Sequence, residues 1–183
     1  TTKKILLMFF VLPMIGFGQL TYVPDDNFES YLEKNFMGNG IANDNYVTTA
    51  NIKTVTYLNI HSEGIADLTG IEDFKNLENL LCPGNKLTYL DVSNNTALTS
   101  LYCNHNQITS LDLSNNTALT TLKCGNNNLK TLDLRNGKKA VFHYMCENNP
   151  KLSCINVYDV EWAIEKESNW IKDPGTSFSE ECP

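Results

Sequence analysis

Three adjacent segments of the chain read LENLLCPGNKLTYLDVSNNTA (77–97), LTSLYCNHNQITSLDLSNNTA (98–118) and LTTLKCGNNNLKTLDLRNGKK (119–139). Leucine, cysteine and asparagine recur in them every 21 residues, as Cys82, Cys103 and Cys124 illustrate. Similarity of a sequence to itself at a fixed period of about 20 to 50 residues indicates a repeat architecture. Each copy is then one structural unit that buries its apolar face by stacking against its neighbours.

Each copy contains a strand-like motif that ends in asparagine. In L-x-x-L-x-C-x-x-N, the residues Leu101 and Cys103 are two apart, so both side chains leave a strand on the same, inward face. Asn106 follows where that strand ends, and its carboxamide can donate and accept hydrogen bonds in the turn. We therefore expect ladders of asparagines that satisfy turns rather than contact a ligand. Their members are Asn85, Asn106, Asn127 and Asn149, and in a second series Asn95 and Asn116.

The asparagine motif occurs twice in each copy, as L-x-x-L-x-C-x-x-N-x-L-x-x-L-D-L-x-x-N. This double pattern resembles the nested, or IRREKO, type of bacterial leucine-rich repeat, and it is similar to secreted or surface proteins of Bacteroidetes. The resemblance implies a flattened β-solenoid: a leucine-rich repeat fold with one well-formed parallel β-sheet and a shorter strand or extended segment opposite. Neighbouring strands of such a sheet lie about 4.8 Å apart.

The flanking segments are expected to extend and close the stack, because an uncapped stack would expose its apolar end rungs. Residues 55–76 resemble an internalin-like repeat, and residues 140–158 read as a degenerate last repeat, which makes about five rungs with the three copies in 77–139. Residues 19–54 are predicted to form an α-helical N-terminal cap. It would contain a helix over 25–36 and a helical turn near 48–53, with Asp26 and Glu29 at capping-box spacing. Residues 159–183 resemble the short C-terminal cap of the same family.

The first eighteen residues have the layout of a secretory signal peptide. Lys3 and Lys4 precede an uncharged apolar run from Ile5 to Gly18, and small residues stand before a cleavage point ahead of Gln19. A membrane anchor is the alternative, but it needs about 20 apolar residues and this run is shorter. We therefore expect a protein that is secreted or held at the cell surface, without membrane insertion after cleavage, in a compartment where disulfides persist.

Charge and composition limit the partners. The chain has 183 residues and a formal net charge of −7, which argues against nucleic acid or an anionic membrane as partner. Loss of Lys3 and Lys4 with the leader would make the charge more negative by two. The sequence calls for no cofactor and no metal, and a monomer is expected.

The six cysteines divide into two groups. Cys82, Cys103, Cys124 and Cys146 recur in the inward column of successive rungs, where we expect a ladder of buried free thiols that act as small apolar side chains. Parallel side chains on neighbouring strands hold their β-carbons too far apart for easy disulfide formation. Cys154 lies one residue off the inward pattern of Ile155, so it should face outward. The family resemblance, in which a cysteine pair brackets the C-terminal segment, makes Cys182 its expected disulfide partner.

Other polar residues form weaker candidates for sites. Asp91, Asp112 and Asp133 form an outward acidic column, for which Ca²⁺ bridging stays open as an alternative to carboxylates that accept hydrogen bonds nearby. His61, His105 and His143 are expected on outward positions of the main strands in every second rung, too far apart to share a zinc ion. The chain contains no G-x-S-x-G or H-E-x-x-H motif, and we expect no enzyme activity.

The outward face of the main sheet is the remaining candidate site. Exposed aromatic and amphipathic side chains on a rigid support are typical of binding hot spots. The residues expected there are Tyr57, Asn59, His61, Leu81, Tyr102, Asn104, His105, Lys123, His143, Met145 and Glu147. The sequence thus favours an exported, non-enzymatic module that binds protein or glycan on this open face. The alternatives are a structural or adhesive spacer of a surface system and, less favoured, a secreted hydrolase or hydrolase inhibitor.

Overall fold

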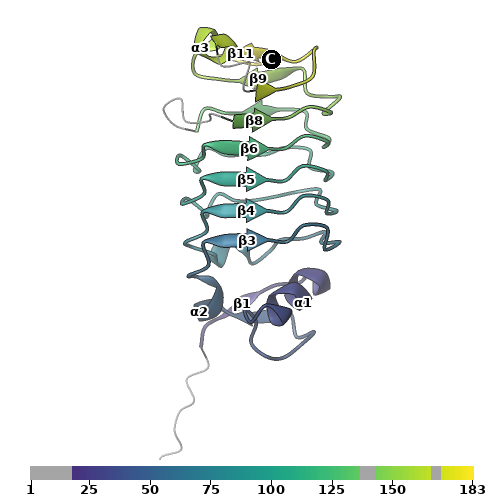
Figure 1. Ribbon diagram of the computed structural model, residues 1–183, viewed down its shortest axis with the longest axis vertical. Helices are drawn as coiled ribbons and strands as arrows, with labels where there is room; N and C mark the ends of the chain where they lie inside the picture. The colour runs from purple at the N-terminus through teal and green to yellow at the C-terminus, as the bar shows by residue number, and fades with distance from the viewer. Residues whose placement is uncertain (1–17, 137–142, 166–169) are drawn as a thin grey trace, which may run out of the picture.

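The computed structural model describes residues 18–136, 143–165 and 170–183, which form an elongated stack of coils (Figure 1). Apart from Gly18, the leader expected over residues 1–18 lies outside the described residues. Residues 137–142, at the expected junction between the last 21-residue copy and the degenerate repeat, also lie outside them.

A parallel sheet of six strands runs along one side of the stack (Figure 1). Its strands are, in spatial order, β3 (Tyr57–Asn59), β4 (Asn79–Leu81), β5 (Ser100–Tyr102), β6 (Thr121–Lys123), β8 (His143–Met145) and β10 (Trp170–Ile171). The register follows the repeat period, because Leu80 pairs with Leu101 and Leu101 with Leu122. Equivalent residues therefore stack on one another, and every coil presents the same inward and outward positions.

The opposite side of the stack carries less regular structure. Three parallel strands form a second sheet there: β7 (Leu132–Asp133), β9 (Cys154–Asn156) and β11 (Ser177–Ser179). In earlier coils the equivalent segments, 90–92 and 111–113, are not regular strands. Those coils are still joined, since Gln107 N–H donates to the Leu87 carbonyl at 2.8 Å. The expected flattened parallel-sheet solenoid, with a shorter strand or extended segment opposite the main sheet, is confirmed.

Columns of leucine fill the space between the two sides. Leu58, Leu80, Leu101 and Leu122 are at most 1% exposed, and Tyr144 and Trp170 continue the same column. The leucines of the opposite side face them, so the buried apolar residues form one continuous core. The repeated Leu-x-x-Leu spacing thus produces a core that is continuous from coil to coil.

The asparagine ladders lie inside the turns, as expected. Asn106 Nδ2 donates to the carbonyls of Cys82 and Cys103 at 3.0 Å, and Asn106 Oδ1 accepts from Leu87 N–H at 3.0 Å. One side chain therefore satisfies backbone groups of two coils that water cannot reach. Asn85, Asn127 and Asn149 make equivalent bonds, and Asn95 and Asn116 donate in the second series.

The N-terminal end of the stack contains two helices and a small antiparallel sheet. These elements are β1 (Leu20–Tyr22), α1 (Asp26–Lys34), β2 (Tyr46–Thr48) and α2 (Thr49–Ile52). A 3₁₀ helix, η1 (Ile71–Asp73), belongs to the first coil. Phe28 of α1 stacks on Phe74 with ring centroids 6.3 Å apart, and the Tyr31 hydroxyl donates to the Asn59 carbonyl at 2.6 Å. Helix α1 therefore lies against the first coil.

The capping box expected for this helix is wrong by one residue. Asp25, not Asp26, caps α1, because Asp25 Oδ1 accepts from the N–H groups of Asn27 and Phe28, both at 3.0 Å. Glu29 does not reach back to the cap; it is buried and accepts from Asp44 N–H at 3.0 Å. Glu29 thus holds the loop that follows the helix, a tertiary contact that capping-box spacing could not reveal.

The C-terminal segment adds one more coil than the sequence predicts. After α3 (Val160–Glu165), β10 pairs with β8 in the main sheet and β11 pairs with β9 in the second sheet. Trp170 enters the inward leucine column, 5.4 Å from Phe178 and 5.5 Å from Trp162 between ring centroids. The expectation of about five rungs is therefore short by one, because tryptophan replaces leucine and a helix breaks the period.

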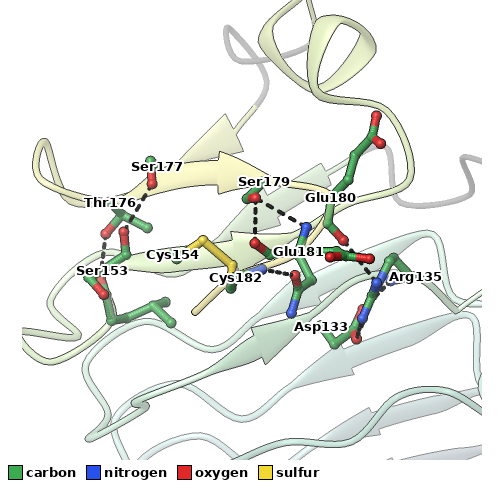
Figure 2. Close-up of a disulfide and its surroundings, with 12 residues drawn as sticks. Asp133, Arg135, Ser153, Cys154, Thr176, Ser177, Ser179, Glu180, Glu181 and Cys182 are labelled. Carbon is green, nitrogen blue, oxygen red and sulfur yellow. Dashed lines mark hydrogen bonds and ion pairs between the residues drawn. A yellow bond between two sulfur atoms is a disulfide. The ribbon is translucent and has the colours of Figure 1, made fainter.

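A disulfide closes this last coil, as the family resemblance implied. Cys154 and Cys182 are bonded, with their α-carbons 5.8 Å apart (Figure 2). Cys182 N–H donates to Asn156 Oδ1 at 2.7 Å, and Arg135 Nη1 donates to the Glu180 carbonyl at 2.9 Å. The chain end is thus fixed to the second sheet by one covalent bond and by polar contacts from two coils.

Candidate binding surface

The outward side of the main sheet carries two columns of side chains, one at each outward position of the strands. We call this surface the open face. The first column is Tyr57, Asn79, Ser100, Thr121 and His143, and the second is Asn59, Leu81, Tyr102, Lys123, Met145 and Ile171. Because the backbone between them is hydrogen-bonded into a sheet, their relative positions are held by the fold and not by the side chains themselves.

A hollow of about 350 Å³ lies on the open face toward the C-terminal end of the sheet. It is lined by Tyr102, Thr121, Lys123, His143, Tyr144, Met145 and Ile171. Lys123 Nζ lies 4.4 Å from the centre of the Tyr102 ring, a cation–π contact within one column. The hollow therefore combines apolar walls with one cationic group, a pattern typical of small recognition pockets.

Seven of the eleven predicted open-face residues lie on the strands, and four do not. Tyr57, Asn59, Leu81, Tyr102, Lys123, His143 and Met145 lie in the two columns. His61, Asn104, His105 and Glu147 lie beyond the strand ends, in the turns. The strands of the main sheet are at most three residues long, so these four residues lie just past the carboxyl ends of the strands.

The histidines are not equivalent, contrary to the expectation that all three occupy outward strand positions. Only His143 does so. His61 follows the inward Ile60 in a turn, and His105 has a positive φ of 56°. His105 shares its left-handed position with Ser62, Gly84, Asn126 and Asn148 of the other coils. That position is a backbone requirement of the tight turn, where asparagine and histidine are enriched among non-glycine residues.

The Glu147 side chain leans toward the neighbouring coil, just beyond the end of its strand. The position that a β-carbon would take on Gly125 is 3.0 Å from the Glu147 carboxyl carbon, so this carboxylate covers the glycine of the neighbouring coil. Of the predicted face residues, Glu147 is the only carboxylate. Glu147 lies outside both strand columns, and the column residues that the structure describes include no acidic side chain.

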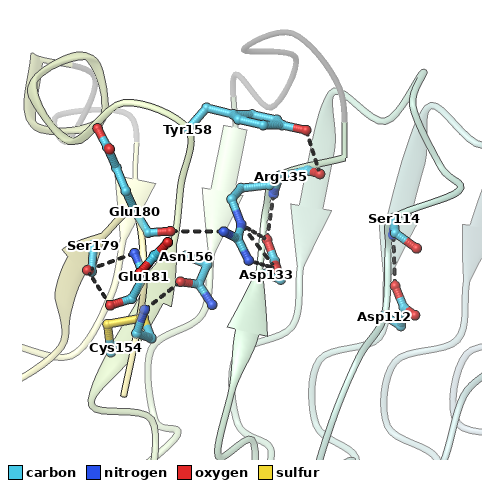
Figure 3. A network of polar contacts seen from close by, with 11 residues as sticks. Asp112, Ser114, Asp133, Arg135, Cys154, Asn156, Tyr158, Ser179, Glu180 and Glu181 are labelled. Carbon is cyan, nitrogen blue, oxygen red and sulfur yellow. Dashed lines mark hydrogen bonds and ion pairs between the residues drawn. A yellow bond between two sulfur atoms is a disulfide. The ribbon is translucent and has the colours of Figure 1, made fainter.

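The acidic column lies on the opposite side of the stack, along a groove of about 610 Å³ lined by Asp91, Asp112 and Asp133. Each carboxylate accepts from the backbone N–H two residues later, at 2.9 Å, as Asp112 does from Ser114 (Figure 3). Hydrogen bonds from Ser93 lower the pKa of Asp91, and a hydrogen bond from Arg135 lowers that of Asp133. Across the described residues, no group of three or more ionisable ligands could hold a metal ion. All three carboxylates of the column thus accept the local hydrogen bonds expected for them.

The four repeat cysteines are free and buried. Burial raises the pKa of the Cys103 and Cys146 thiols to about 12 and moves those of Cys82 and Cys124 well above their usual range. A thiol with such a pKa stays protonated at neutral pH and is a poor nucleophile. The four thiols therefore act as apolar core side chains, like the leucines beside them.

Ile171 is the functional candidate that sequence reasoning missed. It is 45% exposed, pairs with Met145 and lines the hollow. The sequence places its segment in the C-terminal cap because residues 159–183 resemble the closing segment of the family. The adjacent pair Trp170-Ile171 was the available signal in the sequence, since two large apolar neighbours on a strand point to opposite faces.

In the parts of the chain that the structure describes, no helix is both long and apolar enough to cross a bilayer. The exposed large apolar side chains found there lie on the sheets, at the N-terminal end, in helix α3 and, as Tyr89 and Tyr158, in connecting segments.

Comparisons with known proteins agree with this architecture. A family model described as leucine-rich repeats (2 copies) matches residues 96–136. Over 75 residues the chain is 41% identical to Internalin J of Listeria monocytogenes serotype 4b (strain F2365). The match covers 41% of this chain but only 8% of that protein.

Two solved structures are similar to most of this chain. One is described as the functional domain of InlJ from Listeria monocytogenes, which includes a cysteine ladder: TM-score 0.58, 28% identity, 76% of this chain and 38% of that chain. The other is the internalin inlF from Listeria monocytogenes str. 4b F2365: TM-score 0.56, 21% identity, 82% of this chain and 56% of that chain. This chain therefore contains leucine-rich repeats and has an internalin-like solenoid fold.

Proposed function

We propose that this protein is an exported, non-enzymatic binding module that recognises a protein through its open face. The observation that carries the proposal is the column Leu81, Tyr102, Lys123, Met145 and Ile171, which the strand register aligns on a rigid sheet. Aromatic and long amphipathic side chains of this kind supply most of the binding energy in protein interfaces. Such a row costs little conformational entropy on binding when its support is already ordered.

Export is supported by the disulfide between Cys154 and Cys182, since structural disulfides persist in oxidising compartments. The basic and then apolar leader supports it independently. The cysteine ladder named for the InlJ domain supports a structural role for the four stacked thiols. Membership of the nested repeat type, and a bacterial surface location, are part of the same proposal.

The positions of the reactive side chains support a non-enzymatic role. The described histidines sit in three different columns, and the carboxylates of the acidic column are engaged by backbone N–H groups. The four free thiols are buried and protonated. None of these groups is placed to activate another, as general acid–base or nucleophilic catalysis requires.

A binding screen with matched variants tests the proposal. The purified protein would be applied to arrays of extracellular proteins and of glycans. We expect protein ligands whose binding is lost in the double variant Tyr102→Ala with His143→Ala. The control is Tyr89→Ala with Ser110→Ala, which truncates a tyrosine and a second polar side chain on the opposite side of the stack; it should bind normally.

The remaining outcomes separate the alternatives. Binding that survives the Tyr102 and His143 substitutions would refute the open face as the site. If ligands are found only on the glycan array, the partner is a glycan and not a protein. A protein that binds nothing on either array would support a spacer, and turnover of generic ester, peptide or glycoside substrates would overturn the non-enzymatic assignment.

A further inference from the structure

The hollow on the open face lies across four neighbouring coils. Tyr102 of β5, Lys123 of β6 and Met145 of β8 are successive members of one column, and Ile171 of β10 follows them. Neighbouring strands in a sheet are about 4.8 Å apart, so these side chains form a continuous row. Thr121 and His143 form the adjacent wall. The volume of about 350 Å³ is at the small end of the range for ligand pockets.

Charge is distributed unevenly between the two sides of the molecule. The chain carries a net charge of −7, yet among the described outward positions of the six strands Lys123 is the only formal charge. The acidic side chains Asp91, Asp112 and Asp133 lie in the groove on the opposite side. At physiological ionic strength the screening length is about 8 Å, so a partner at the hollow senses Lys123 more than the net charge.

Lys123 is held where a partner would meet it. Its ammonium group lies 4.4 Å from the centre of the Tyr102 ring, a cation–π contact that favours a position beside the hollow. Glu147, the carboxylate nearest in sequence to β8, is turned onto Gly125. An interface that covers this row would remove the Lys123 ammonium from water, and an uncompensated buried charge is strongly unfavourable. A partner that covers the row is therefore favoured if it brings a negative charge to Lys123.

We propose that the partner is a polypeptide segment in which an aromatic or large aliphatic side chain stands beside an aspartate or glutamate. This inference rests on the proposed function of the open face. The apolar side chain enters the hollow against Met145, Ile171 and the Tyr102 ring. The carboxylate pairs with Lys123 at its rim, which replaces the water lost by the ammonium group and fixes the register of the segment.

A peptide selection tests this inference directly. A library of random linear twelve-residue peptides would be selected on the purified protein, and the enriched sequences synthesised. We expect an acidic residue next to an aromatic or large aliphatic residue in the enriched motif. Binding measured by calorimetry should weaken at least about tenfold in Lys123→Glu, the size of effect expected for truncating one side of a close charge pair.

A charge exchange and a matched control make the test specific. Replacing the acidic residue of the peptide by lysine should restore binding to Lys123→Glu and abolish binding to the unmodified protein. Lys130→Glu changes an exposed lysine of the same 21-residue copy that lies outside the open-face strands, and it should leave the affinity unchanged.

The outcomes distinguish this inference from the proposed function. Peptides that lose binding in Tyr102→Ala but show no acidic enrichment would overturn the partner chemistry and leave the open face as the site. Selected peptides that are all insensitive to Tyr102→Ala would overturn the open face itself. If no peptide is selected and a sialylated oligosaccharide binds through Lys123, the partner is an acidic glycan and not a polypeptide.

Discussion

Single asparagine side chains connect the coils of this protein. Asn106 makes three hydrogen bonds with buried backbone groups of Cys82, Leu87 and Cys103. In a solenoid each coil contacts only its neighbours, so a defect in one turn weakens the contact on both sides of it.

We expect Asn106→Ala to lower the free energy of unfolding by about 2–4 kcal/mol, because buried donors and acceptors would lose their partner. Urea denaturation followed by circular dichroism measures this change. The control Asn115→Ala alters an exposed asparagine beside the second ladder and should change stability by at most about 0.5 kcal/mol. Equal effects of the two substitutions would refute the ladder as the source of stability.

The buried thiols make the free energy of unfolding depend on pH in the alkaline range. The Cys103 pKa rises from 9.0 to about 12 on folding, so between these values the folded state binds more protons than the unfolded state. Stability from this group is complete below pH 9 and is lost as the pH rises through 12.

The free energy of unfolding should fall between pH 8 and pH 10, and in Cys103→Val this fall should be smaller by about 1 kcal/mol. The size follows because one pKa unit corresponds to about 1.4 kcal/mol. Denaturation curves at several pH values measure the slope. Ile60→Val, in the same inward column, removes a methyl group without removing a titrating group and should leave the slope unaltered. An unchanged slope in Cys103→Val would contradict the assignment.

At the scale of single elements, one carboxylate connects α1 to the first coil. Asp25 Oδ1 caps the helix, and Asp25 Oδ2 accepts from the N–H groups of Ala66 and Asp67 at 2.8 and 3.1 Å. Asp26, the next residue, is exposed. Two adjacent aspartates thus have different structural roles.

Asp25→Ala should cost roughly 2 kcal/mol of unfolding free energy, since both the cap and the contact with the coil are lost. Asp26→Ala, the matched control, should cost well under 1 kcal/mol. Thermal denaturation of both variants measures these two losses of stability. A larger loss in Asp26→Ala would contradict the cap at Asp25 and support the capping box suggested by the spacing of Asp26 and Glu29.

The disulfide should stabilise the last coil more than the rest of the stack. Its cysteines are 28 residues apart, for which loop entropy gives about 3–4 kcal/mol. In Cys154→Ala with Cys182→Ala, hydrogen exchange should speed up in β9 and β11 and stay nearly unchanged in β4. A reducing agent should lower the stability of the unmodified protein but not of this variant; uniform exchange along the whole stack would argue against a local role.

Regular elements were predictable because their residues repeat. A period of 21 with leucine, cysteine and asparagine in fixed places determines strand, turn and register together, and β4, β5 and β6 lie where that period places them. Prediction failed where tertiary contacts replace the motif. Trp170 fills a leucine position after a helix, and Glu29 is held by Asp44, so neither carries a local signal.

At the scale of the whole molecule, the stack has two unlike sides. The strand columns of the open face present Tyr102, Lys123, Met145 and Ile171, whereas the opposite side presents the acidic column. Alternation along each strand made most of the open face predictable. Its limits were not predictable, because His61 and His105 belong to turns whose left-handed residues only the backbone geometry reveals.

The central claim, that the open face is the binding surface, is tested most directly by hydroxyl-radical footprinting of the protein with a ligand from the array screen. Tyr57 is 56% exposed on the open face, and Tyr89 and Tyr158 are 66% and 55% exposed away from the open-face columns, so all three should oxidise in the free protein. We predict that the ligand protects Tyr57, Tyr102 and Met145 and leaves Tyr89 and Tyr158 unchanged. Protection of Tyr89 and Tyr158, with Tyr102 and Met145 still oxidised, would contradict the account.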